Sequence, residues 1–198
     1  GIRAGSFQMH DHFYRSVVMT SCPDVCGPID GMIGTAEKVA KEWGVTREDA
    51  DAFALESQRK AVAAQQAGRF NEEIVAVEVP GRRGAVTMVS VDEGPRADTT
   101  LEGLAKLAPI QGGVVTAGNA STLNDAAAAV VLMSEERAKA LGKKPLGYLK
   151  SWAAAGVHPH VMGMGPVPAV RKALAKAGMT IEEMDLIELN EAFAVQAI

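Results

Sequence analysis

The residues best placed for chemistry stand where an apolar run, residues 184–189, is followed by Asn190 and Glu191. A helix-like pattern starts directly after this polar pair. An asparagine side chain carries both a donor and an acceptor, so Asn190 could hold a water molecule or simply cap the helix. Strand ends that meet helix starts are where open α/β sheets bind ligands. Position alone favours the capping role.

Residues 116–125, TAGNASTLND, are a second candidate site because small polar side chains gather there between two apolar segments. Such a loop can bind a polar ligand through its N–H and hydroxyl groups. It can equally satisfy its own backbone through turns closed by Asn and Asp side chains, with Gly118 relieving the backbone. The sequence supports the two interpretations about evenly.

Residues 161–168, VMGMGPVP, combine two methionines with two glycines next to proline. Methionine is flexible and apolar, and glycine allows close approach, so the segment could hold an acyl or pantetheine-like chain. The commoner role of methionine is to fill a core, and that alternative stays open.

Cysteine and histidine patterns do not predict a metal site. Cys22 and Cys26 are too few for a disulfide framework, and no second Cys or His pair stands near them. Two H-x-H pairs also lack a third predicted ligand: His10 with His12, and His158 with His160. The sequence contains no P-loop, GxGxxG, GxSxG or HExxH motif.

Composition limits the class of protein. The chain has 198 residues, 47% of them hydrophobic, and a net charge of −4, which suits one or two globular domains. No apolar run approaches the ~18 residues of a membrane-spanning helix. The charge argues against binding to nucleic acid or an anionic membrane, while local basic groups could still bind an anionic small molecule. No signal peptide is visible, so we expect an intracellular, by default cytoplasmic, protein whose natural N-terminus lies upstream of Gly1.

The elements that must position these residues alternate between helix and strand, which predicts an α/β protein. Two capping boxes, Thr46 with Asp49 and Thr180 with Glu183, mark helix starts. Helices are predicted over residues 34–44, 46–68, 99–110, 134–142 and 169–179, with another beginning at 191. Strands are predicted over residues 72–80 and 85–96 (a hairpin), 114–116, 126–133, 148–157 and 185–190.

Five stretches in order resemble the thiolase family, the acetyl-CoA acetyltransferases and 3-ketoacyl-CoA thiolases. They cover residues 31–61, 91–109, 115–134, 161–174 and 190–197. The resemblance implies the thiolase fold: two related α/β halves with mixed sheets and central helices, plus an α+β loop domain, here incomplete. Residues 1–123 would be the loop domain, 124–144 the last strand and helix of the N-terminal core domain, and 145–198 the beginning of the C-terminal core domain.

The resemblance also implies an activity: thiolytic cleavage of 3-ketoacyl-CoA, or condensation of two acyl-CoA molecules. No tightly bound cofactor is implied, because the coenzyme A thioesters are substrates. Asn190 resembles the asparagine that holds a water molecule in an oxyanion hole, a type of donor that contributes ~2.7–4 kcal/mol. The residues that resemble CoA-binding positions are Met32, Arg96, Ser121, Met162, Ala192 and Phe193.

The sequence departs from the family pattern in two ways. Ala126 stands where glycine is usual, Gly103 where some members have serine, Gly31 where some have histidine, and His158 where an acidic residue is common. The family's nucleophilic cysteine, its histidine and its second cysteine have no match here, and Cys22 and Cys26 fit neither cysteine motif. We therefore expect a middle fragment of a thiolase that is inactive alone, with the accepted acyl-chain length left open.

Two alternatives remain. One is a non-catalytic thiolase-like protein, such as a lipid-transfer or acyl-CoA-binding relative or a β-ketoacyl synthase cousin. The other is an unrelated α/β nucleotide-binding module. The family resemblance further implies a homodimer or homotetramer for the full-length protein. Because the apolar run 126–133 would lack sheet neighbours, we expect marginal stability and aggregation of this chain.

Overall fold

The computed structural model describes residues 27, 31–81 and 84–198. The chain divides into two compact units, Gly1–Lys38 with Ser121–Asn190, and Val39–Ala120 with Glu191–Ile198. The cysteines and the first histidine pair of the sequence lie outside the described residues. No helix within the described ranges is both long enough and apolar enough to cross a membrane.

Two consecutive helices, α3 (Gly31–Trp43) and α4 (Arg47–Gln66), follow local sequence signals. Gly44 separates them and has a φ of 70°, a left-handed conformation that glycine adopts without strain. Thr46 is the N-cap of α4: its hydroxyl accepts from the Asp49 N–H, and the Asp49 carboxylate accepts from the Thr46 N–H at 3.1 Å. The predicted capping box is confirmed.

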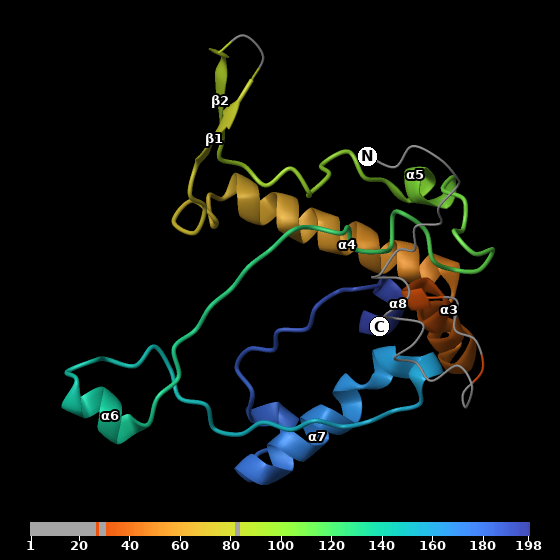
Figure 1. The fold of residues 1–198 in the computed structure, drawn as a ribbon. Coiled ribbons are helices and arrows are strands. Elements are labelled where there is room, and N and C mark those ends of the chain that lie inside the picture. The colour runs from red at the N-terminus through yellow and green to blue at the C-terminus, as the bar shows by residue number, and fades with distance from the viewer. Residues whose placement is uncertain (1–26, 28–30, 82–83) are drawn as a thin grey trace, which may run out of the picture. The chain divides into compact units, whose positions relative to one another are not determined.

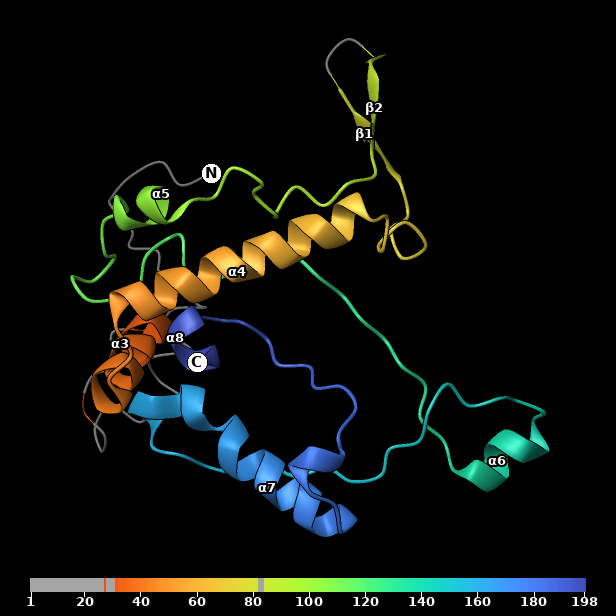
Figure 2. The same ribbon diagram turned by 180° about the vertical axis from the view of Figure 1, so that it is seen from behind.

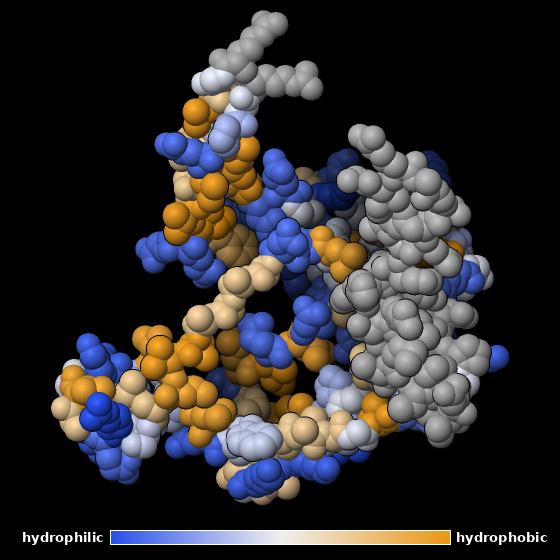
Figure 3. All heavy atoms as spheres, in the orientation of Figure 1, coloured by the Kyte–Doolittle hydropathy of each residue, from blue (hydrophilic) through white to orange (hydrophobic). Residues whose placement is uncertain are grey.

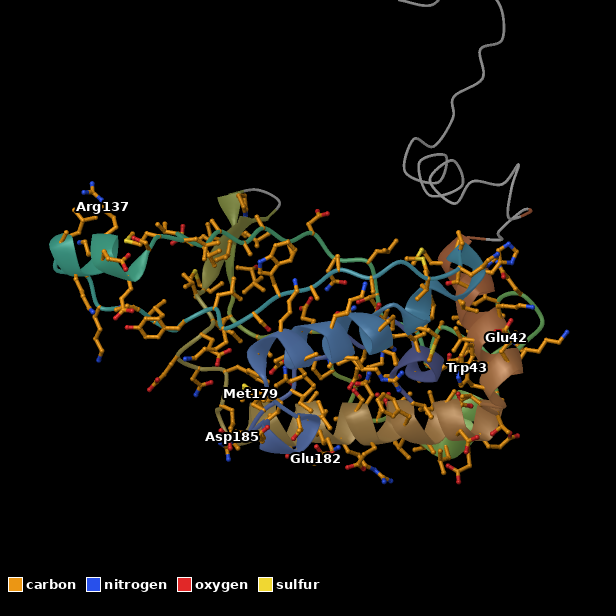
Figure 4. The ribbon with its side chains drawn as sticks, turned by 90° about the horizontal axis from the view of Figure 1, so that it is seen from below. Glu42, Trp43, Arg137, Met179, Glu182 and Asp185 are labelled. Carbon is orange, nitrogen blue, oxygen red and sulfur yellow. The ribbon has the colours of Figure 1, made fainter. Side chains whose placement is uncertain are left out.

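Ala36, Val39 and Ala40 of α3 are buried, whereas Trp43 at the end of the helix is 51% exposed. Figure 4 labels Trp43 on this helix. On α4, Ala50, Ala54 and Leu55 are buried together with Asp51. A buried aspartate on this face was not expected from the pattern.

The unit formed by Val39–Ala120 and Glu191–Ile198 is built on α4. Two short helices, α5 (Leu101–Ala105) and α8 (Ala194–Ala197), pack against it, as Figures 1 and 2 show from opposite sides. Leu104 of α5 and Val195 of α8 are buried, and Val115 in the loop after α5 is fully buried. The apolar core of this unit therefore lies along one side of a single long helix.

The predicted hairpin is confirmed but is shorter than its apolar pattern. β1 (Val77–Pro80) pairs antiparallel with β2 (Val86–Val89), with Val77 opposite Val89. Every residue of both strands is exposed, and Figure 3 shows their hydrophobic atoms on the surface. A two-stranded hairpin alone is marginally stable in water, so the pairing of β1 with β2 contributes little stability by itself.

The other unit contains α6 (Glu135–Ala140), the 3-10 helices η2 (Pro159–Met164) and η3 (Ile181–Glu183), and α7 (Pro166–Ala177). The Ser134 hydroxyl caps α6 by accepting from the Arg137 N–H at 3.2 Å, as predicted. The second capping box sets only the single turn of η3, where the Thr180 N–H donates to Glu183 at 2.7 Å. Residues 159–164, which overlap the Met- and Gly-containing segment 161–168, form η2.

Ser151 and Trp152 are hydrogen-bonded to α7. The Ser151 hydroxyl donates to the Ala173 carbonyl at 2.6 Å, and Lys176 donates to the Trp152 carbonyl at 3.0 Å. The Lys176 ammonium also lies 5.1 Å from the centre of the Trp152 ring, a cation–π distance. Side-chain bonds to main-chain carbonyls thus replace the sheet pairing that the sequence predicted for 148–157.

Three of the predicted strands, 126–133, 148–157 and 185–190, are not strands in the described structure, because a strand needs a hydrogen-bonded neighbour. The apolar compositions of 126–133 and 185–190 are typical of buried strands, but these two runs are not buried: Val131 is 84% exposed and Leu186 is 77% exposed. Residues 114–116 are not a strand either, although Val115 and Thr116 are fully buried. The expectation of aggregation stays a prediction.

Replacing Thr46 by alanine should lower the free energy of unfolding by about 1 kcal/mol, because α4 loses its N-cap. Hydrogen bonds from Thr46 hold the pKa of Asp49 below its ordinary value of 3.8. The contribution of the Asp49 carboxylate to the free energy of unfolding is therefore complete well above pH 3.8. It is lost as the pH falls through the lowered pKa of Asp49. Urea unfolding at neutral pH and at about pH 2.5 should show the gap between wild type and T46A narrowing in acid. An equal difference in unfolding free energy at the two pH values would contradict the role of the Asp49 carboxylate in the cap.

Candidate active site

A buried charge network on α4 organises the unit that contains residues 39–120 and 191–198. Asp51 is buried, and its carboxylate accepts from the Arg47 Nε at 2.7 Å, one helical turn away. The same guanidinium donates to the carbonyls of Leu104 at 2.7 Å and Leu107 at 3.0 Å. Arg47 therefore neutralises the buried carboxylate and ties the end of α5 to α4.

Asn119 completes this network from the polar loop. Its amide nitrogen donates to the other oxygen of Asp51 at 3.0 Å and to the Val114 carbonyl at 3.1 Å. Its side-chain oxygen accepts from the Thr116 N–H at 2.8 Å. Three of the four hydrogen bonds that an asparagine side chain can make are filled, so Asn119 has a structural role.

The main chain beside Asn119 holds the C-terminal motif. The Asn119 carbonyl accepts from the Ala194 N–H at 2.9 Å, and Ala120 forms an antiparallel bridge with Phe193. The Ser57 hydroxyl on α4 donates to the Glu191 carboxylate at 2.6 Å. Residues 191–194 are therefore fixed between the polar loop and α4.

Gly118 has a steric rather than a backbone reason to be glycine. A Cβ atom there would lie 2.5 Å from a methyl carbon of Leu104 and 2.7 Å from one of Leu107. A side chain at this position would require these leucine methyl groups to move.

The predicted site residues are distributed over both units. Arg96, Ala192 and Phe193 belong to the unit built on α4. Ala192 and Phe193 are partly buried there. Phe193 is the N-cap residue of α8, so Asn190 is not the cap that its position suggested. The remaining predicted residues belong to the other unit: Met32, Ser121, Met162 and Asn190.

The predicted site residues of the other unit differ in how exposed they are. Ser121 and Asn190 are exposed. Met32 is partly buried in the first turn of α3, where its carbonyl accepts from the Thr35 hydroxyl at 2.7 Å. Met162 lies in η2 and is 46% exposed. Neither methionine fills a fully buried core, which leaves both side chains able to contact a ligand.

Arg96 lines a pocket of about 150 Å³ formed by one face of α4 and the loop that follows the hairpin. The Arg96 N–H donates to the Gln58 side chain at 2.7 Å, which fixes the loop on the helix. Sequence reasoning missed the helix side of this pocket, although its helical spacing could have indicated it. The α4 residues that line it are Leu55, Gln58, Arg59, Val62, Ala63 and Gln66.

The second histidine pair does not form a metal site. The rings of His158 and His160 lie 5.1 Å apart, and the His160 N–H donates to Nδ1 of His158 at 3.4 Å. Across residues 31–81 and 84–198, no three His, Cys, Asp or Glu side chains are placed to hold one ion. Nothing in this pair favours a metal-assisted reaction.

Comparison with known proteins gives the class to which this fold and site belong. The profile described as "Thiolase, N-terminal domain" matches residues 1–136, and "Thiolase, C-terminal domain" matches residues 143–198. The chain belongs to the thiolase family. The domain bounds expected from the sequence stay a prediction.

Individual relatives narrow the comparison. The acetyl-CoA acetyltransferase of Pseudomonas aeruginosa is 56% identical over 83% of this chain and 42% of its own length. That of Shinella zoogloeoides is 50% identical over 100% of this chain and 49% of its own length. The crystal structure of the Bacillus anthracis acetyl-CoA acetyltransferase matches with a TM-score of 0.82 at 42% identity, over 100% of this chain and 49% of that one. The predicted incomplete thiolase fold is confirmed, and the chain spans about half the length of the curated relatives it matches.

Replacing Asn119 by alanine should lower the free energy of unfolding by about 2–4 kcal/mol, because it leaves the buried Asp51 and the Thr116 N–H without partners. Urea unfolding measures the loss. Hydrogen exchange should show faster exchange at Ala194. Asn124→Ala is the matched control, since Asn124 is exposed and bonds only to its neighbour Thr122 among the described residues. Equal losses in the two variants would contradict the structural role.

Proposed function

We propose that the protein is an acyltransferase of the thiolase type, which cleaves 3-ketoacyl-CoA by thiolysis or condenses two acyl-CoA molecules. The family and the 50–56% identity to proteins named acetyl-CoA acetyltransferases support this proposal. The observation that carries it is the fixed position of residues 191–194, directly after Asn190, which are bonded to the polar loop through Ala194 and Phe193. A preorganised segment at this point suits a site that must hold donors in place before reaction.

Asn190 would supply the electrophilic help for carbon–carbon bond chemistry. Loss of a proton from the α-carbon of an acyl-CoA places negative charge on the thioester oxygen. An amide N–H, acting through a bound water molecule, stabilises that charge without itself changing protonation. Because α8 begins after Phe193, the Asn190 side chain is not occupied in capping the helix.

The CoA substrate would be held by groups suited to each part of it. Arg96 offers a guanidinium for the phosphates at the nucleotide end, and Ser121 a hydroxyl for an amide of the pantetheine arm. Met32, Met162, Ala192 and Phe193 offer apolar contact to the arm and the acyl group. Pockets for drug-sized ligands are typically ~300–1,000 Å³, so the pocket at Arg96, at about 150 Å³, suits one end of CoA.

The covalent steps need a cysteine nucleophile, a histidine and a second cysteine, which residues 1–198 do not match. The 198-residue chain alone should therefore show no thiolysis of a 3-ketoacyl-CoA above the buffer rate. Loss of substrate absorbance in the presence of CoA measures this. Turnover that disappears in Asn190→Ala would contradict the expectation, because the 198-residue chain would then be catalytic.

A homodimer or homotetramer remains our proposal for the whole protein.

In a complete thiolase that contains this segment, Asn190→Ala should lower kcat by about 10²–10³-fold, because one oxyanion-hole donor is removed. The KM for the CoA thioester should change little, since the donor acts on charge that develops during reaction. Steady-state kinetics give both values. Asn71→Ala, at an exposed turn after α4, is the control and should leave kcat unchanged. A complete protein that binds acyl-CoA but has no turnover would instead favour the non-catalytic alternative.

A further inference from the structure

The pocket beside α4 contains a second cation that the family resemblance did not assign. Arg59 lines the pocket from α4. Arg96, Ala97 and Thr99 line it from the loop that follows the hairpin. The remaining lining is apolar or amide, and no carboxylate is among the lining residues. A protein with a net charge of −4 thus presents two guanidinium groups and no acid at one small pocket.

The loop that carries Arg96 is held against the turn of α4 that carries Arg59. The Arg96 N–H donates to the side chain of Gln58, the residue before Arg59, at 2.7 Å. Further along the helix, the Gln65 amide donates to the Asp92 carbonyl at 2.7 Å. The Arg96 carbonyl is in turn bonded by the Thr99 hydroxyl at 2.9 Å. These bonds use backbone atoms of the loop, so they position Arg96 without occupying its guanidinium.

Both guanidinium groups are free to bind an anion. Among the described residues, neither Arg59 nor Arg96 takes part in an ion pair, whereas Arg47 on the same helix is committed to Asp51. Two forks of N–H donors beside apolar surface match a phosphate attached to an aromatic base. Leu55, Val62 and Ala63 supply that apolar surface on the helix.

We propose that Arg59 is a second phosphate-binding residue of this pocket and that, with Arg96, it binds the phosphorylated nucleotide end of coenzyme A. The inference rests on the proposed function, because coenzyme A is the ligand that the function supplies. It adds a residue that determines how strongly the nucleotide end is bound and that takes no part in bond making. Its effect should fall on ligands that carry phosphate and spare those that do not.

Titration calorimetry of the 198-residue chain with coenzyme A, adenosine 3′,5′-bisphosphate and pantetheine tests the proposal. Arg59→Gln should weaken binding of the bisphosphate and of coenzyme A about tenfold, the loss of one charge-assisted hydrogen bond, and leave pantetheine binding unchanged. Arg59→Lys should recover part of the affinity, because it keeps the charge but loses the fork. The control is Lys60→Gln, which removes the same charge one residue away and outside the pocket lining, and should change affinity less than about twofold. Circular dichroism verifies that each variant keeps its helices.

The outcomes separate this inference from the proposed function. If coenzyme A binds and Arg96→Gln weakens it while Arg59→Gln does not, the role of Arg59 is overturned and the function stands. If Lys60→Gln weakens binding as much as Arg59→Gln, the effect is general electrostatics and the inference is again overturned. If the folded wild-type chain binds neither coenzyme A nor the bisphosphate, the role of Arg59 is overturned, while the proposed function is decided separately by the kinetics of the complete protein.

Discussion

A carboxylate buried on a helix constrains the unit that contains residues 39–120 and 191–198. Removing Asp51 from water costs several kcal/mol unless its charge is paired and its oxygens accept hydrogen bonds. Arg47 pairs with one oxygen and Asn119 donates to the other. The two partners that satisfy Asp51 are also the groups that reach α5, the polar loop and, through the Asn119 main chain, α8. Satisfying one charge thereby fixes three short segments that have little apolar area of their own.

The same network settles the role of one residue of the polar loop. Asn119 points its amide into the network and has a structural role, while Ser121, two residues later, is exposed. Of the two interpretations that the sequence left open, the structural one applies to Asn119. Ligand binding by Ser121 stays a prediction.

Local signals in the sequence predicted the helices. The strands and the buried network depend on pairing between distant residues, which local signals do not indicate. The caps at Thr46 and Ser134 involve residues three apart, so they can be read directly from the sequence. The bond between Asn119 and Asp51 joins residues 68 apart, and no pattern in either segment indicates it. Apolar runs such as 126–133 have strand composition but no hydrogen-bonded neighbour among the described residues, so composition alone predicted the wrong structure there. The thiolase fold and the site residues came from the resemblance, and the helix side of the Arg96 pocket came only from the structure.

The antiparallel bridge between Ala120 and Phe193 has a consequence for folding kinetics. It closes the chain at both ends of residues 121–190, so the unit on α4 is assembled from segments that are distant in sequence. The bond from Ser57 to Glu191 spans 134 residues. Contacts of such separation form slowly, because loop entropy is lost before the contacts stabilise the chain. Docking of α8 should therefore be a late event in folding, after α4 and α5 have formed, and the length of the intervening chain should alter its free energy only slightly, by about 0.6 kcal/mol for each doubling.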